Sequence, residues 1–457
     1  MRNFFLKYRL EIIVFAIALA ARLLFFSASF EAHGHNIVET IKGDDGYYEA
    51  SQNFIHGHGF SYSSAPPYAP NPLRPPVWLF IIAAIAGIFK SYWAVFIFEV
   101  LIGSFIPVLG MIIVRKLFAQ KAVWLGTGVL LALEPYCVML STLLYSETMF
   151  TFFFLLFFLF LIKYFEDKSY RSLAWVSVFM GLATLVKPTI QYIPIVLALF
   201  IIFEARKSLS KKTFAHALVM LGVFGAIIAP WIVRNYVEFG KIGMSAQPAF
   251  NLYIYLVPTV LSIDNHTNFK TELDSFVYKK GFDVSDITLA TSDRYSSEAM
   301  AIIREHKLAL AKSVATTIVT FFTHDGMLTF LAYAGKTIVN TLDKPALTIL
   351  IESPAKLFSI IGAYVRSGAA IIVIMRLVWI MVTISFFAGA AAYIRREGWR
   401  PAASAALFLV IYFALTTSIN GLGVNARFRV PVDAFIFSFA LYGLLLARHT
   451  ILGKLKR

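Results

Sequence analysis

The sequence predicts an all-α polytopic membrane protein, and three observations support this expectation. Hydrophobic residues make up 59% of the 457 residues and charged residues only 15%, whereas about a quarter of a soluble domain is charged. Apolar segments long enough to cross a bilayer recur along the whole chain. Basic residues lie in short clusters between these segments, as they do in cytoplasmic loops. The clusters account for the net charge of +15 without any nucleic-acid partner.

The apolar segments predict the helices in order. The first segment, near 11–28, follows a basic N-terminus and is expected to be a retained signal anchor. The segment 77–89 is too short for an ordinary span and is typical of an interfacial or re-entrant helix. We expect about 10–12 transmembrane helices in a bundle with a long first extracytoplasmic loop. The expected spans after the first lie near 92–114, 122–140, 147–164, 172–187, 189–204, 213–233, 369–394, 402–419 and 430–447.

The basic clusters predict that both termini are cytoplasmic and that residues 29–91 lie outside. We expect an N-terminal transmembrane catalytic module over 1–234, which includes that loop. An extracytoplasmic or interfacial insert is expected over 235–368, and C-terminal transmembrane helices over 369–457. The insert contains two apolar pieces, 307–323 and 346–363. They are either a further pair of spans or interfacial helices, and we slightly favour interfacial helices. The absence of eukaryotic sorting signals favours a bacterial inner membrane.

The first loop holds the residues best suited to chemistry. The stretch IKGDDGYYEAS places Asp44 and Asp45 between two glycines, and Arg74 follows just before two prolines and the short apolar segment. A carboxylate can take a proton from a hydroxyl, and an arginine at a helix start can hold a phosphate. This combination fits transfer of a group from a phosphate carrier to a hydroxyl. The alternative is that the two aspartates cap a helix that begins at Tyr47.

Four further polar residues on the expected outer side are candidates for substrate binding. Tyr48 and His56 lie on the short helix that follows the aspartates. Glu147 opens the segment 147–164, where it either faces the same cavity or complements a helix dipole. Lys187 lies in the tight turn between two spans. A divalent metal ion could join the acids, but the histidine pairs of this loop have no obvious third ligand, so the metal stays open.

Three arginines lie outside against the charge rule, which makes them candidate phosphate ligands. Arg234 follows the segment 213–233. Its alternative role is that of an interfacial arginine, which keeps its aliphatic stem buried and extends its charged group to the membrane surface. Arg427 and Arg429 precede the last span, and their alternative is pairing with Asp433 or another outside acid.

The ordered motifs resemble a known family. GDDGYYEASQNFIHGHGF and LRPPVWLF resemble the first extracytoplasmic loop of C-superfamily glycosyltransferases. The protein O-mannosyltransferase-like and lipid A aminoarabinose transferase-like bacterial members are the most similar. Later segments resemble that family in the same order, and the likeness is weakest over 260–370: EPYCVMLSTLLYSETMF, LVKPT, PWIVRNYVEFGKIG and NARFRVPVDAF.

This resemblance implies a C-superfamily bundle that transfers a sugar from a polyprenyl-phosphate donor to a hydroxyl of a lipid, glycan or protein. It implies an active site on the outer membrane face and inversion at the anomeric carbon. Asp44 would be the base, Asp45 would support it or bind substrate, and Arg74 would hold the lipid phosphate. Two other functions remain as alternatives: a transporter or flippase, and a polymerase or ligase of lipid-linked oligosaccharides.

Overall fold

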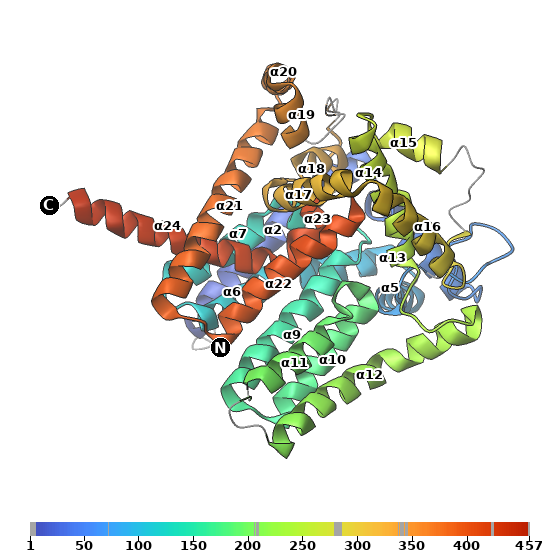
Figure 1. Cartoon of the computed structure of the whole chain (residues 1–457), viewed down its shortest axis with the longest axis horizontal. Coiled ribbons are helices and arrows are strands. Elements are labelled where there is room, and N and C mark those ends of the chain that lie inside the picture. Colours follow the sequence, from blue (N-terminus) through green and yellow to red (C-terminus); the bar gives the residue numbers. More distant parts are fainter. Residues whose placement is uncertain are drawn as a thin grey trace. The chain divides into compact units, whose positions relative to one another are not determined.

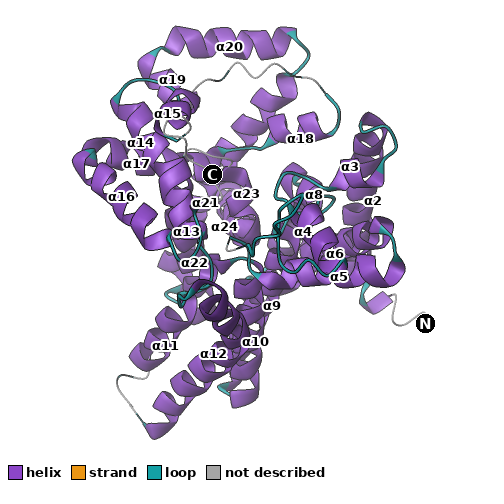
Figure 2. Cartoon of the chain, turned by 90° about the vertical axis from the view of Figure 1, so that its right-hand side faces the viewer, coloured by secondary structure: helices purple, strands orange, loops and turns teal. Residues whose placement is uncertain are grey.

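The computed structural model describes residues 6–71, 73–204, 206, 210–277, 286–336, 338, 342, 346–421 and 425–455. Within these ranges the secondary structure is helical and contains no strand (Figure 2), which confirms the all-α expectation. Seven helices of the described chain are long and apolar enough to cross a membrane. They are α2 (Arg9–Ala32), α6 (Tyr92–Leu117), α9 (Glu147–Asp167), α12 (Lys211–Phe239), α21 (Ala370–Glu397), α22 (Pro401–Thr417) and α24 (Asp433–Leu455).

Shorter apolar helices lie at the other expected segments. These are α5 (Pro76–Phe89), α7 (Lys121–Leu133), α10 (Tyr170–Val186) and α11 (Ile193–Glu204). The expected span 122–140 is wrong as one helix, because α7 ends at Leu133 and a separate helix, α8 (Pro135–Leu140), begins after Glu134, where the proline lacks the N–H that would continue the helix. In the insert, α17 (Lys307–Thr323) and α18 (Met327–Tyr333) together are apolar enough to cross, but they bend by 62° at the break between them. Such a bend is typical of a broken span or a re-entrant loop. The total of 10–12 spans stays a prediction.

The contacts divide the chain into two compact units. The first contains Met1–Ser245 with Trp399–Ala405, and the second contains Ala246–Gly398 with Ala406–Arg457. In the first unit α6 packs against α2, α7 and α9, while α10 packs against α9 and α12. Figure 1 shows α9, α10, α11 and α12 side by side. The three-part division expected from the sequence concerns membrane topology, which this grouping by contacts does not address.

Local signals set the helix ends of the first unit. Ser91 caps α6 by accepting from the backbone N–H of Trp93, and Ser210 caps α12 by accepting from that of Thr213. α12 ends at Gly240, whose positive φ of 67° closes the last turn. Pro76 occupies the first turn of α5, where its missing N–H costs nothing.

Ion pairs join the basic ends of the helices. Arg115 of α6 pairs with Glu11 of α2 at 2.8 Å, and Lys116 pairs with Glu166 of α9 at 3.1 Å. The opposite ends of these three helices therefore lie together, and the first loop and the start of α9 are found there.

Candidate functional site

The aspartate pair lies in a tight turn between α3 (Ile37–Ile41) and α4 (Tyr47–Ile55). Gly46 has a φ of 74°, and a Cβ at this position would lie 2.5 Å from a ring carbon of Tyr62. Only glycine avoids both the strain and the clash. Gly46 is also the N-cap residue of α4, and as a glycine it supplies no capping side chain. The helix begins at Tyr47 as expected, and Gly46 rather than either aspartate occupies its N-cap position. The choice between capping and chemistry for the two aspartates stays a prediction.

Asp45 is held by Arg74. Its Oδ1 accepts from Nη2 of Arg74 at 3.1 Å, and its side chain is 8% exposed. The guanidinium also lies 5.9 Å from the ring centroid of Tyr47. Asn71 fixes the approach to α5, because its Oδ1 accepts from the backbone N–H groups of Leu73 and Arg74. The loop thus places a guanidinium two residues before a helix start, next to a carboxylate.

Asp44 has different surroundings. It is exposed, and it accepts a hydrogen bond from the hydroxyl of Tyr145. No cation of the described chain forms an ion pair with it. Tyr145 comes from the turn before α9, and this turn is tied to the first loop by the N–H of Leu144, which donates to the carbonyl of Ile41 at 2.7 Å. The two adjacent carboxylates are therefore chemically distinct.

A second ion pair lies at the start of α9. Lys187 donates to Oε1 of Glu147 at 2.5 Å, and their side chains are 19% and 1% exposed. Glu99 of α6 is buried beside Glu147, and in the described part of the chain its Oε1 has no hydrogen-bond partner. Glu147, which forms the ion pair with Lys187, therefore has a second buried carboxyl group beside it.

Tyr47 links the two ion pairs. It is fully buried, its hydroxyl is hydrogen-bonded to Ser146, and both Arg74 and Glu147 act on it electrostatically. Burial raises the pKa of Tyr47 to about 12, while the charge of Arg74 acts in the opposite direction. The phenol therefore stays protonated at neutral pH. The structure brings Tyr47 of the first loop close to the pair of Glu147 and Lys187, and the roles of these two residues in substrate binding stay predictions.

Arg234 lies near the end of α12 and is surrounded by aromatic rings. Its guanidinium is 4.8 Å from the centroid of Trp231, 5.6 Å from that of Phe60 and 5.3 Å from that of Phe239. Its Nη1 also donates to the side chain of Asn235 at 2.9 Å. A cation held in this way keeps its charge at a fixed position near the first loop, to which Phe60 belongs.

Tyr48 and His56 are less closely tied to the aspartates. The ring of Tyr48 packs against Tyr92 with centroids 5.0 Å apart. His56 is exposed, and its Nδ1 lies 2.8 Å from the carbonyl oxygen of Gln52 in its own helix. Their roles in substrate binding stay predictions.

Arg429 lies in the second unit and is completely buried. Its Nε donates to Asp433 at 2.9 Å, and its Nη1 donates to the carbonyls of Phe321 and His324 at 2.8 Å each. The guanidinium lies 3.3 Å from the ring centroid of Trp379. This is the pairing with Asp433 that the sequence left open, so Arg429 is not carried into the proposed site. Its neighbour Arg427 is partly exposed.

Two residues of this region were missed in the sequence. Glu99 is the single acid within the apolar segment 92–114, and an ionisable group inside a span is a signal of function that could have identified it. Tyr145 gave no such signal, because its contact with Asp44 exists only after two distant loops meet.

Comparison with known proteins identifies the kind of enzyme. A family model described as dolichyl-phosphate-mannose-protein mannosyltransferase matches residues 73–233. The match and the polytopic all-helical structure fit a C-superfamily glycosyltransferase. They support a membrane glycosyltransferase that uses a polyprenyl-phosphate-linked sugar. The matched segment contains Arg74, Glu147 and Lys187 and begins after the two aspartates. No curated protein matches the chain.

Proposed function

We propose that the protein transfers one sugar from a polyprenyl phosphate to a hydroxyl acceptor, with inversion and with Asp44 as the general base. The reaction takes place at the extracytoplasmic face of a bacterial inner membrane. The observation that carries this proposal is the difference between the two aspartates. Asp45 is engaged by Arg74, whereas Asp44 is exposed and accepts a hydrogen bond from Tyr145. An exposed, oriented carboxylate is what a general base requires.

The mechanism needs a base on one side of the anomeric carbon and positive charge on the other. Asp44 takes the proton of the acceptor hydroxyl while the hydroxyl oxygen forms a bond to the anomeric carbon. The bond from that carbon to the phosphate oxygen breaks, and the phosphate leaves with both electrons. A single displacement of this kind inverts the configuration. The hydrogen bond from Tyr145 fixes the direction of the Asp44 carboxylate.

Arg74 is the best-placed ligand for the leaving phosphate. Its guanidinium can bind two phosphate oxygens at once, and the first turn of α5 adds backbone N–H groups and a favourable dipole. Asp45 orients the guanidinium through their hydrogen bond. Lys187 and Arg234 add further positive charge, which stabilises the charge that develops on the phosphate. The acceptor is a hydroxyl of a lipid, a glycan or a protein.

A divalent metal ion does not fit Asp45 or Glu147 well. Asp45 is paired with Arg74, and Glu147 is paired with Lys187. A metal ion at either carboxylate would have to displace or repel the ammonium or guanidinium group already there. We therefore route no step through a metal.

The test uses purified full-length protein with a panel of radiolabelled polyprenyl-phosphate sugars, and it follows acceptor-dependent loss of sugar from the lipid. Asp44→Asn should lower turnover by ~10²–10⁴-fold, because the amide keeps the shape of the side chain and still accepts from Tyr145. Glu39→Gln changes an exposed acid of the same loop, paired with Lys42, and should leave turnover unchanged.

Full activity of the Asp44→Asn variant would refute the role of Asp44. Binding of the donors without consumption would favour a transporter or flippase. Transfer of whole oligosaccharides rather than single sugars would favour a polymerase or ligase.

A further inference from the structure

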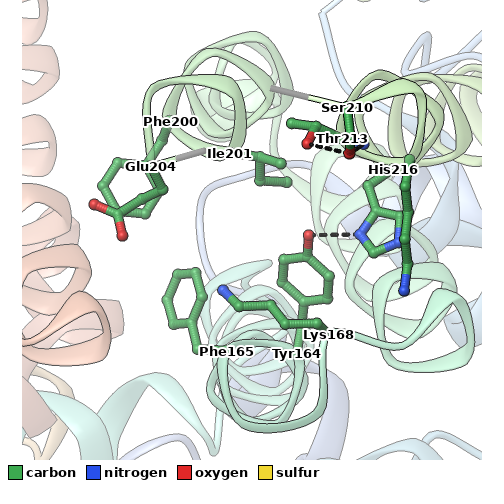
Figure 3. Close-up of a pocket in the computed structure, with 10 residues that line it drawn as sticks. Tyr164, Phe165, Lys168, Phe200, Ile201, Glu204, Ser210, Thr213 and His216 are labelled. Atoms are coloured by element: carbon green, nitrogen blue, oxygen red, sulfur yellow. Dashed lines mark hydrogen bonds between the residues drawn. The ribbon is translucent and has the colours of Figure 1, made fainter. Parts of the chain in front are cut away.

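A cavity of about 340 Å³ lies in the first unit, at the basic end of the helices (Figure 3). Side chains from the end of α9, the end of α11 and the start of α12 line it. Phe165, Phe200 and Ile201 form an apolar part of the wall, and the remaining lining is polar or charged. Because the spanning helices end here, the cavity is at the height of a membrane surface rather than in the middle of the bilayer.

Two lysines of this cavity lack a carboxylate partner. Lys168 follows α9 with a φ of 48°, and its ammonium group lies 5.3 Å from the ring centroid of Tyr164. Lys212 is the second residue of α12. In the described ranges neither ammonium group has a carboxylate oxygen within 4.0 Å. The two acids that directly precede Lys168 have other partners, since Glu166 pairs with Lys116 and Asp167 accepts from Ser172 at 2.7 Å.

Glu204 is the acid in the lining of the cavity. Burial lowers the pKa of Lys168, and the charge of Glu204 acts in the opposite direction. The lining therefore carries two positive charges and one negative charge, which suits a ligand with a single negative charge.

The start of α12 adds to the preference for an anion. The first turn of a helix favours acidic side chains because of the helix dipole, but this turn carries two lysines and no acid. Ser210 and Thr213 contribute hydroxyl groups, 3.2 Å apart. A 29-residue helix that begins with two lysines is best stabilised when an anion lies at its N-terminus.

His216 fixes the side of the cavity at which Tyr164 lies. It lies one turn after Lys212, lines the cavity and is only 5% exposed. Its Nδ1 lies 2.9 Å from the hydroxyl of Tyr164 (Figure 3), whereas its Nε2 has no partner among the residues described. When Tyr164 donates to Nδ1, the proton of the neutral ring is on Nε2. Because Nε2 is itself buried and the ring packs against Tyr170 with centroids 4.3 Å apart, His216 forms a fixed part of the wall rather than a contact for a ligand.

We propose that this cavity binds the phosphodiester group of an acidic phospholipid. The two ammonium groups and the hydroxyls of Ser210 and Thr213 suit the phosphate oxygens. The aromatic and aliphatic wall suits the glycerol and the first methylene groups of the acyl chains. Basic pockets between helices at a membrane surface are a known way to recognise such head groups.

The experiment measures lipid retention by native mass spectrometry on the full-length protein released from detergent. Phosphatidylglycerol and phosphatidylcholine with identical acyl chains are compared. The wild type should retain phosphatidylglycerol in preference, and Lys168→Met and Lys212→Met should each weaken that retention about fivefold. Glu204→Gln should strengthen it, since the repelling charge is removed. Lys121→Met is the matched control, because Lys121 is exposed on α7 and does not line the cavity.

Equal retention of the two lipids by the wild type would refute the proposal. Retention of phosphatidylglycerol by a Lys168→Met/Lys212→Met variant at the wild-type level would also refute it. Inorganic phosphate is the third probe, and thermal protection by millimolar phosphate without any lipid preference would show a site for the free ion instead. Glu204→Gln keeps the test valid if a lysine variant fails to fold. None of these measurements depends on sugar transfer.

Discussion

The ion pair between Lys187 and Glu147 allows a quantitative test of the site. Lys187→Met keeps most of the side-chain volume but removes the ammonium group that lies 2.5 Å from a carboxylate with 1% exposure. The carboxylate of Glu147 would then be buried beside Glu99 without its cation. Removing one partner of such a pair costs about 3–5 kcal/mol. We expect a value near 3 kcal/mol, since Lys187 keeps some contact with solvent.

The double variant Lys187→Met/Glu147→Gln removes both charges, so most of this loss should be recovered. We expect the double variant to be destabilised by less than about 2 kcal/mol, because a neutral amide is far cheaper to bury than an uncompensated charge. The assay is unfolding of the purified proteins in mixed micelles, monitored by tryptophan fluorescence. The coupling energy is taken from the wild type, the two single variants Lys187→Met and Glu147→Gln, and the double variant.

The same variants separate a structural role of Lys187 from substrate binding. If Lys187 also contacts the donor phosphate, the double variant should recover stability but not donor affinity. A Lys187→Met variant as stable as the wild type would contradict the reasoning. So would a double variant whose loss equals the sum of the two single losses.

Three further outcomes are expected. Arg74→Lys keeps the charge but loses the planar fork, so the KM for the donor should rise about tenfold, and an unchanged KM would argue against phosphate binding. Gly46→Ala introduces a strained φ of 74° and a clash with Tyr62, which should cost over about 1 kcal/mol and reduce transfer strongly. Gly59→Ala, with a similar φ and no neighbour found near its Cβ position, is its control. Arg429→Met should cost about 3–5 kcal/mol while donor affinity in the folded fraction stays unchanged.

The helices could be predicted from the sequence because apolar length and basic flanks are local properties. The expected segment 213–233 lies within α12, and the expected segment 92–114 lies within α6. The start of α4 at Tyr47 also followed from local pattern, since an acidic turn preceded it. The bend between α17 and α18 was not foreseen, because such a change of direction depends on tertiary packing rather than on hydropathy.

The partners of the site residues could be predicted only in part. Sequence reasoning selected Asp44, Asp45 and Arg74 as chemically suited, but it could not decide between capping and chemistry. The structure adds that Gly46, in a left-handed conformation, occupies the N-cap position itself, while the role of the two aspartates stays a prediction. Arg429 violated the charge rule in the sequence, and the physical reason is burial against Trp379 rather than a ligand.

The length of α12 has a consequence for the membrane in which the protein works. Lys212 and Arg234 are both on this helix, and at 1.5 Å per residue their Cα atoms are separated by roughly 33 Å along its axis. The hydrocarbon layer of a typical bilayer is about 30 Å thick. One continuous helix thus matches the distance between the two head-group layers, with a cation at each boundary. A thinner bilayer would make α12 tilt or bury one of these charges, so the protein should prefer membranes of ordinary thickness.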